Sequence, residues 1–334
     1  MVKQVRLTDY PEGQAARAYW AFVNDDVSPL NENEIKLRID WVSVDPGMSG
    51  WITNKPSYMP PVKPGTVMRA FGVGEVVESR SDRFQIGDWA TGFLGLQTEG
   101  VFSQKAIRKL DLGELPPHLF LSGLGMTGYT AYFGMMDIGC PEAGDTVMVS
   151  AASGAVGGIA AQLAKQAGAR VIGIAGGPVK CAYLTDELGL DAAIDYKAGH
   201  LNEALDAAAP DGIDLYFDNV GGDILDAALE RMNYRGRIVV CGGISQYADF
   251  GAARGPANYM RLVTHSLKMQ GFTMRDYMHR VPEALQMLAQ GRADGSLKFR
   301  EHVLQGLDTF PDAFEMLFDG RNHGKLLIDL RGDH

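Results

Sequence analysis

The residues best placed to do chemistry are small ones, in a turn near the middle of the chain. Ala152, Gly154 and Gly157 follow an apolar strand expected at 146–150 and open a helix expected at 154–167. Glycines there let a bulky ligand approach the backbone, and the first amides of the helix lack intrahelical acceptors. Those amides and the helix dipole favour an anion such as a pyrophosphate. The order Ala-x-Gly-x-x-Gly therefore indicates a dinucleotide site, with tight strand-to-helix packing as the alternative.

A second polar feature follows the next expected strand, at 170–175. That strand ends in Gly176 and Gly177, without the acid that would hold the ribose hydroxyls of NAD. Lys180 follows within a turn and suits the additional 2′-phosphate of NADP. A lysine at a helix start opposes the helix dipole, and an anionic ligand would offset that cost. We therefore expect NADP, with a solvated lysine as the alternative.

Three strand ends are rich in small or polar residues, at 150–157, 218–222 and 241–245. In an open parallel sheet the ligand lies beyond the carboxyl ends of the strands. These turns are therefore expected to share one rim of the sheet and to form one site. Each could also be a tight turn and nothing more.

The elements that must position these turns alternate from residue 119 onward. Strands are expected at 146–150, 170–175, 192–194, 213–218, 236–241 and 268–271, and helices at 154–167, 180–188, 200–209, 223–232 and 257–266. Alternation of this kind predicts right-handed crossovers and a doubly wound parallel sheet with helices on both faces.

The first third of the chain predicts a different architecture. Strands expected at 3–7, 34–44, 67–78 and 88–93 are separated by turn residues, which favours a mostly antiparallel, partly closed β-barrel. The tail adds strands at 297–304 and 325–330 around a helix at 309–318, and the last strand is expected to return to the barrel. The α/β chain thus divides into a barrel domain, 1–118 with 300–334, and a dinucleotide domain, 119–299. We expect the reaction site in the cleft between the two.

Composition excludes several classes of partner. The net charge of −10 argues against nucleic acid and against an anionic membrane surface. We expect no membrane span, because no apolar run is long enough. Three scattered cysteines, Cys140, Cys181 and Cys241, indicate a reducing compartment and a cytoplasmic protein.

Taken together, the motifs resemble those of a known family. They lie at 57–61, 67–69, 73–77, 125–132, 151–157, 217–222 and 241–245. Along nearly its whole length the chain resembles the zinc-independent medium-chain dehydrogenases/reductases. Within them it is similar to the NADPH-dependent alkenal, leukotriene and prostaglandin reductases and the curcumin reductases. The resemblance implies a GroES-like barrel as the catalytic domain, a Rossmann domain, and NADPH as cofactor.

The resemblance also implies the contacts of the cofactor. The pyrophosphate turn would be Ser153, Gly154, Ala155, Val156 and Gly157, and the adenosine phosphate end would meet Gly176, Lys180 and Tyr196. The nicotinamide half would contact Asn219, Cys241, Gly242, Gly243, Ile244, Ser245, Tyr247, Phe272, Thr273, Met274 and Asn322. The linking helix would contribute Thr127 and Thr130. Three of these have simple alternatives. Tyr196 could be a solvent-edge tyrosine, Asn219 a helix cap, and Asn322 a turn residue before Gly324.

Departures from the family pattern bear on specificity and on metal. Gly177 stands where relatives often carry serine, which removes one hydroxyl contact to the 2′-phosphate. Residues 45–50 lack the tyrosine and arginine that relatives carry near the substrate. Residues 68–72 occupy the place of the Gly-His-Glu zinc segment, and no cysteine precedes Cys140. Zinc prefers nitrogen and sulfur ligands, so we expect no metal.

Without a metal, the expected reaction is conjugate reduction of an α,β-unsaturated ketone or aldehyde. Hydride from the cofactor reaches the β-carbon, and hydroxyl donors stabilise charge on the carbonyl oxygen. Tyr58 and Tyr259 are the expected donors. The alternatives are an NADPH-dependent quinone oxidoreductase and a non-catalytic NADPH-binding protein. By analogy with relatives we expect a homodimer that pairs through residues 236–271 of the Rossmann domain.

Overall fold

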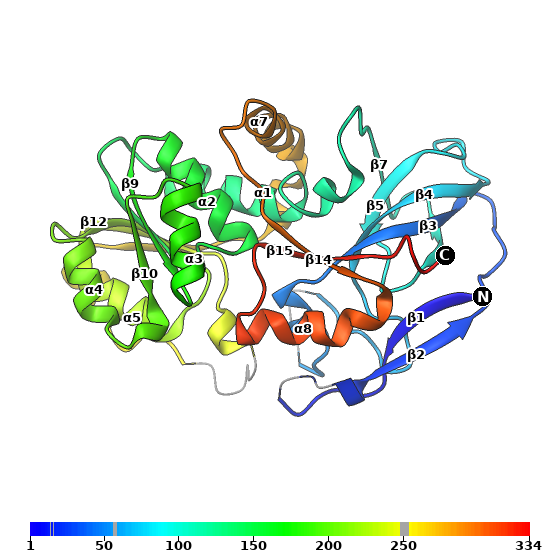
Figure 1. Cartoon of the computed structure of the whole chain (residues 1–334), viewed down its shortest axis with the longest axis horizontal. Coiled ribbons are helices and arrows are strands. Elements are labelled where there is room, and N and C mark those ends of the chain that lie inside the picture. The colour runs from blue at the N-terminus through cyan, green and yellow to red at the C-terminus, as the bar shows by residue number, and fades with distance from the viewer. Residues whose placement is uncertain (14, 16, 56–58, 248–253) are drawn as a thin grey trace. The chain divides into compact units, whose positions relative to one another are not determined.

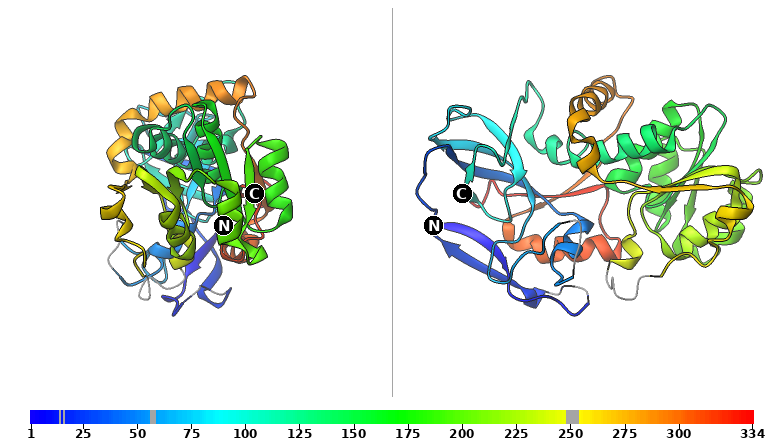
Figure 2. Two further views of the ribbon diagram at one scale, coloured as in Figure 1. Left: turned by 90° about the vertical axis from the view of Figure 1, so that its left-hand side faces the viewer. Right: turned by 180° about the vertical axis from the view of Figure 1, so that it is seen from behind.

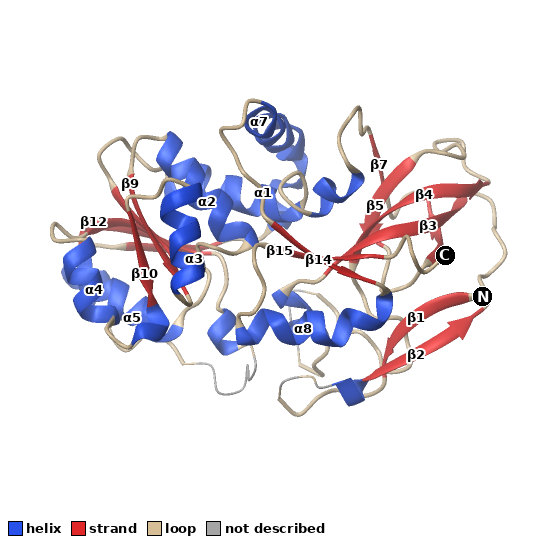
Figure 3. Cartoon of the chain, viewed as in Figure 1, coloured by secondary structure: helices blue, strands red, loops and turns tan. Residues whose placement is uncertain are grey.

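The computed structural model describes residues 1–334 apart from 14, 16, 56–58 and 248–253 (Figure 1). The chain forms two compact units. The first contains Met1–Leu121, Glu301–Asn322 and Leu326–His334, and the second contains Ser122–Arg300 and His323–Lys325. Sheet strands and helices are both present in each unit (Figure 3).

The first unit is built on an antiparallel sheet with the order β14-β15-β3-β4-β5-β7, in which β6 also pairs with β3. The strands are β3 (Glu34–Ser43), β4 (Phe71–Ser79), β5 (Trp89–Phe93), β6 (Glu99–Ser103), β7 (Arg108–Leu110), β14 (Glu301–Gln305) and β15 (Lys325–Asp329), and β1 (Val2–Leu7) pairs separately with β2 (Trp20–Asp25). The long strand β3 is central because β4, β6 and β15 all pair with it. The antiparallel sheet predicted for this part of the chain is confirmed.

The end of the chain returns to this unit, as predicted. Strand β15 pairs antiparallel with β3, with Leu327 opposite Ser43. The preceding helix α8 (Phe310–Asp319) buries Phe310 and Phe314, and both rings contact Trp20 edge-on at 4.9 and 5.9 Å between centroids. The apolar face of α8 therefore completes the core of the first unit.

The second unit is a six-stranded parallel sheet with the order β10-β9-β8-β11-β12-β13. Its strands are β8 (Thr146–Val149), β9 (Arg170–Ala175), β10 (Ala192–Asp195), β11 (Ile213–Asp218), β12 (Met232–Val240) and β13 (Lys268–Gly271). This is the doubly wound order, in which the chain reverses direction across the sheet between β8 and β11. The predicted parallel sheet is confirmed.

Helices lie on both faces of the parallel sheet (Figures 1 and 2). They are α1 (Met126–Tyr132), α2 (Ala155–Gln166), α3 (Pro178–Ala182), α4 (Leu201–Ala208), α5 (Gly222–Arg231), α6 (Arg261–Thr264) and α7 (Val281–Ala293). Leu205 of α4 and Leu225 of α5 share one buried cluster with Met148 and Ile172 of the sheet. Burial of these apolar faces stabilises the crossover helices against the sheet.

Several predicted boundaries were wrong for identifiable reasons. Strand β12 begins at Met232, not at 236, because a register shift opposite β11 and a positive φ of 64° at Arg235 form a bulge that lets pairing start earlier. The helix expected at 257–266 is reduced to α6, because the backbone and side chain of Asn258 bind Asp226 and Glu230 on α5. The segment 180–188 continues past α3 as a π-helical turn at Tyr183–Glu187.

Other edges shifted by a few residues. Strand β4 starts at Phe71 instead of 67, since Met68 already bonds to Val5 outside the main ladder. Strand β14 starts at Glu301 instead of 297. Among the described residues, no helix combines the length and apolar character required to cross a membrane.

Candidate cofactor-binding site

The glycine turn between β8 and α2 has the geometry of a phosphate cradle. The N–H of Gly154 donates to the carbonyl oxygen of Ala151 at 2.8 Å, and Ala151 adopts a left-handed φ of 48°. A Cβ on Gly157 would lie 2.4 Å from that same oxygen, so only glycine fits there. The helix is capped by Gly154, which offers no side-chain acceptor to the first-turn amides. These amides are therefore available to an anion, and the donor set fits a pyrophosphate.

A segment near the end of the chain supports this turn from within the same unit. Gly324 forms a parallel bridge with Gly154. It has a φ of 74°, and a Cβ there would lie 2.1 Å from the carbonyl oxygen of Arg300. Glycine is therefore required at 324 by both backbone angle and space. Asn322, a predicted cofactor residue, precedes it by two positions.

The carboxyl ends of β8, β11 and β12 are joined by a hydrogen-bond network with Ser150 and Asp218 buried at its centre, here called the inner rim (Ser150, Asp218–Gly222 and Cys241–Ser245). Asp218 is 1% exposed. Its Oδ1 accepts from the hydroxyls of Tyr216 at 2.7 Å and Ser150 at 3.3 Å, and from the N–H groups of Val220 and Gly221, each at 2.9 Å. One carboxylate oxygen therefore organises the turn that follows β11.

Burial dominates the electrostatics of the inner rim. It raises the pKa of Asp218 above its usual value, although the four hydrogen bonds act in the opposite direction. Burial and the neighbouring Asp218 carboxylate raise the pKa of Tyr216 well above its usual value. The same two causes raise the pKa of the Cys241 thiol to about 12, which keeps that thiol protonated at neutral pH.

The loop after β12 is bound to the turn after β11. The N–H groups of Cys241 and Gly242 donate to the carbonyl oxygen of Asp218 at 2.9 and 3.1 Å. Further along, the N–H of Ile244 donates to the oxygen of Asn219, and the hydroxyl of Ser245 donates to that of Val220. The structure thus brings together the predicted rim residues from 219 to 245.

Two predicted residues of this rim have defined roles in the network. Asn219 is not a helix cap: α5 is capped by Gly221, and the Asn219 amide donates from Nδ2 to the carbonyl oxygen of Ser150 at 2.7 Å. The hydroxyl of Tyr247 accepts the N–H of Gly243 at 3.3 Å. That contact places one phenol at the inner rim.

A second group lies at the ends of β9 and β10, here called the outer end (Gly176, Lys180, Tyr196 and Lys197). A Cβ on Gly176 would lie 3.0 Å from the ring of Tyr196 and 3.0 Å from Cε of Lys197. The N–H groups of Gly177 and Lys197 both donate to Oδ1 of Asp195, at 2.7 and 2.9 Å. The ring of Tyr196 therefore lies next to Gly176, and it is 43% exposed at the edge of the sheet.

Sequence reasoning missed four residues that organise these two groups: Ser150, Asp218, Asp195 and Lys197. Ser150 and Asp218 stood in the small and polar strand ends, but neither was predicted as a site residue. Lys197 directly follows the predicted Tyr196, and its cationic side chain next to Gly176 was the available signal. Asp195 is the last residue of β10, and its side chain caps the short turn that carries Tyr196 and Lys197.

The remaining predicted residues lie on the helix α1 and after β13. Thr127 is buried on α1, and the hydroxyl of Thr130 donates to the carbonyl oxygen of Met126 within that helix. The ring of Phe272 contacts Tyr277 edge-on, and Thr273 opens the turn that contains Met274. Phe272 also closes against Gly134, where a Cβ would lie 2.8 Å from its ring.

Only one of the two tyrosines expected as proton donors belongs to the described residues. Tyr58 lies outside the described residues. Tyr259 is 58% exposed and follows Asn258, which binds Asp226 and Glu230 along α5. The structure therefore places Tyr259 beside α5 and does not bring it together with the inner rim.

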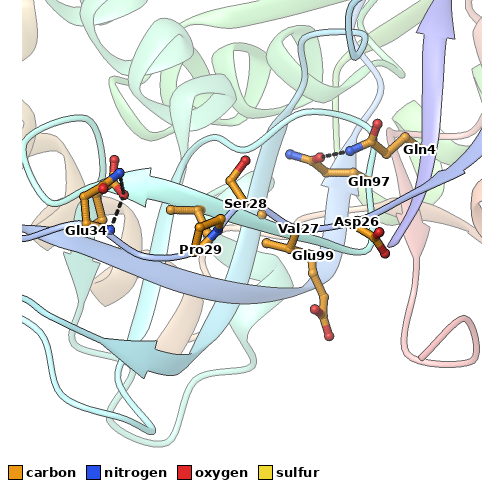
Figure 4. A pocket seen from close by; sticks show the side chains of 11 residues that line it. Gln4, Asp26, Val27, Ser28, Pro29, Glu34, Gln97 and Glu99 are labelled. Atoms are coloured by element: carbon orange, nitrogen blue, oxygen red, sulfur yellow. Dashed lines mark hydrogen bonds between the residues drawn. The ribbon is translucent and has the colours of Figure 1, made fainter. Parts of the chain in front are cut away.

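A separate cavity of about 390 Å³ lies in the first unit (Figure 4). Polar side chains line much of it, among them Gln4, Asp26, Glu34, Gln97 and Glu99, and the amide of Gln4 donates to that of Gln97 at 3.0 Å. It contains none of the predicted site residues. In the described part of the chain, no cluster of three or more His, Cys, Asp or Glu side chains has an arrangement that could hold a metal ion.

Comparison with known proteins gives matches along the whole chain. Residues 3–110 match the family model described as the N-terminal domain of oxidoreductase, and residues 155–290 match the one described as zinc-binding dehydrogenase. The chain is 39% identical to the NADPH-dependent curcumin reductase of Escherichia coli, covering 98% of this chain and 96% of the relative. It is 37% identical to the NADP(+)-dependent 2-alkenal reductase of Nicotiana tabacum, covering 98% of this chain and 96% of the relative.

A solved structure agrees with these relatives. CurA from Vibrio vulnificus in complex with NADPH matches with a TM-score of 0.93 and 39% identity, covering 98% of both chains. Identity at this level over nearly full length shows common descent as well as a common fold. The chain therefore belongs to the medium-chain dehydrogenase/reductase family, in the branch that contains the curcumin, 2-alkenal and prostaglandin reductases.

Proposed function

We propose that this protein is an NADPH-dependent oxidoreductase that reduces the carbon–carbon double bond of α,β-unsaturated ketones or aldehydes. The observation that carries the proposal is the phosphate cradle at Gly154–Gly157, continuous with the inner rim, in a chain 39% identical to an NADPH-bound relative. Relatives named for curcumin and 2-alkenal reduction supply the substrate class.

The residues present fit a phosphorylated dinucleotide. On this proposal, the first amides of α2 bind the pyrophosphate, since Gly154 and Gly157 keep the backbone accessible. Lys180 and Tyr196 of the outer end, together with Lys197 next to Tyr196, meet the adenosine 2′-phosphate, for which a lysine ammonium is a suitable point charge. The inner rim and residues 272–274 hold the nicotinamide half.

The chemistry divides between cofactor and chain. The bound nicotinamide supplies a hydride, which goes to the β-carbon of the enone. The chain's own hydroxyls would then stabilise the negative charge on the carbonyl oxygen, and a proton returns to the α-carbon to complete the reduction. Tyr247 is favoured among the described residues because its hydroxyl lies at the inner rim. Tyr58 and Tyr259 remain predicted donors.

The deciding experiment follows NADPH oxidation across enals, aryl enones and benzoquinones, with NADH run in parallel. Turnover on enones with NADPH as preferred donor supports the proposal. Faster turnover on quinones would replace it with a quinone oxidoreductase. Tight NADPH binding without oxidation by any acceptor would indicate a non-catalytic binding protein.

The proton donor can be identified with single phenylalanine substitutions. Tyr247→Phe is expected to lower kcat on an enone by roughly ten- to a thousand-fold, the range for one lost oxyanion donor. Tyr58→Phe and Tyr259→Phe are compared in the same assay. Unchanged kcat in all three would leave the cofactor ribose and solvent as proton sources.

We also propose a cytoplasmic homodimer paired through the second unit. Among the described strands, edge strand β13 pairs with β12 alone, and exposed apolar side chains occur at Tyr234 on β12, at Val263 on α6 and at Met278 after β13. An edge with apolar neighbours favours pairing with a second copy. All three cysteines carry free thiols, which suits a reducing compartment. Light scattering of the purified protein tests the dimer, and cell fractionation tests the compartment.

A further inference from the structure

Asp218 is a buried residue at the carboxyl end of β11, and its side chain accepts four hydrogen bonds. Its Oδ1 accepts from two side-chain hydroxyls and two backbone N–H groups, all within 3.3 Å. The carboxylate is 1% exposed. No ion pair with it is recorded within the part of the chain that the structure describes. Ionising a buried carboxyl that has no cation beside it is costly, so its presence calls for a role other than stability.

The contacts of Asp218 reach all three loops of the inner rim. Its side chain sets the backbone of Val220 and Gly221, where Gly221 has a φ of 70°. Its main-chain oxygen holds the N–H groups of Cys241 and Gly242. Through Ser150, whose hydroxyl accepts the N–H of Asn219 at 2.9 Å, it is also connected to the end of β8. One residue therefore couples the turns after β8, β11 and β12.

The opposite end of the same strand offers a contrast. Asp214 accepts the N–H of Thr146 at 2.8 Å and the side-chain amide of Asn233 at 2.8 Å, and it is only partly buried. It likewise joins β11 to β8, but at the amino end of the strands, away from the rim. Asp214 is thus a matched residue with the same chemistry and no contact with the rim loops.

We propose that Asp218 is a positioning residue for the nicotinamide half of the site, retained for the geometry of the inner rim at a cost in stability. The inference rests on the proposed function, since it concerns the same cofactor. Small displacements of groups that orient a reacting cofactor lower turnover strongly, and positioning shells of this kind fix such groups.

The test is Asp218→Asn, which keeps a carbonyl oxygen for the donors, removes the charge and replaces the other carboxylate oxygen with an NH2 group. We expect the Kd for NADPH, measured by fluorescence titration, to rise about tenfold and kcat on an enone to fall roughly ten- to a hundred-fold. The melting temperature is expected to stay within about 2 °C of wild type or to rise, since the desolvated charge is gone.

Asp214→Asn is the control. It is expected to leave the Kd for NADPH within about twofold of wild type while lowering the melting temperature by a few degrees, roughly the effect of one weakened hydrogen bond. The proposal is overturned if Asp218→Asn leaves both Kd and kcat within twofold of wild type, or if it lowers the melting temperature as Asp214→Asn does without a larger loss of binding.

If Asp218→Asn does not fold, Tyr216→Phe and Ser150→Ala each remove one donor to the same oxygen. Graded losses of NADPH affinity in the two variants would support positioning, and unchanged affinity in both would contradict it. Failure of the wild-type protein to bind NADPH would instead refute the proposed function, so the two failures are distinguishable.

Discussion

The inner rim and the outer end of the candidate site differ in the burial of their polar side chains and in the interactions that those side chains make. At the inner rim the two central polar side chains, Asp218 and Ser150, are buried, and they join the polar groups of the rim to one another. The outer end is open, with Tyr196 and Lys197 over Gly176 and backbone amides held by Asp195. The difference indicates that the inner rim contributes shape, whereas the outer end contributes charge for an anionic ligand.

The largest effect on NADPH binding is expected at Gly157, where the backbone leaves no room for a Cβ. In Gly157→Ala the new Cβ would lie 2.4 Å from the backbone oxygen of Ala151, so the cradle cannot keep its form. We expect NADPH binding to weaken by more than about a hundred-fold by calorimetric titration, because the amide cradle and the helix start both shift. Gly158→Ala is the milder comparison, because its Cβ would meet the Ala152 oxygen at 3.3 Å, a tight contact that needs a shift of only a few tenths of an ångström. Equal affinity in the two variants would contradict the cradle.

A smaller and more selective effect is expected at the outer end. Lys197→Ala should raise the Kd for NADPH roughly tenfold and leave that for NADH unchanged, because the lysine side chain lies against Gly176 beside Tyr196. Binding of 2′,5′-ADP compared with 5′-AMP, which lacks only the 2′-phosphate, isolates the contribution of that phosphate. The affinity of the variant for NADPH should also depend less on ionic strength.

Lys105→Ala, an exposed lysine of the first unit, serves as the control for charge alone. If Lys197→Ala weakened NADPH and NADH equally, the outer end would contribute packing instead of charge. Lys197→Arg is expected to retain the preference, since a cation remains in place.

The smallest effect concerns pH and the inner rim. Burial raises the folded-state pKa of Asp218 above 3.8, so its stabilising contribution is present below that value and is lost as the pH rises through the folded pKa. Ionisation of this carboxyl in the folded protein therefore costs stability. The melting temperature of Asp218→Asn relative to wild type should rise as the pH increases through the raised pKa of Asp218. A difference that stays constant with pH would show that Asp218 has an ordinary pKa.

Much of the second unit could be predicted because its strands are short apolar runs between turn residues. Strands β9, β11 and β13 were predicted to the residue, at 170–175, 213–218 and 268–271. The failures occurred where long-range contacts override local pattern. The bulge at Arg235 depends on pairing with β11, and the shortening of α6 depends on the carboxylates of Asp226 and Glu230.

The amino-acid sequence by itself determined the parallel sheet, the glycine cradle and the polar character of the strand ends, because periodicity and glycine placement act locally along the chain. Only the tertiary structure decided that Asp218 joins three of those ends and that Lys197 lies over Gly176. A single polar residue carries no periodic signal. Its partners are brought to it from strands up to about seventy positions away, by the order in which the sheet is assembled.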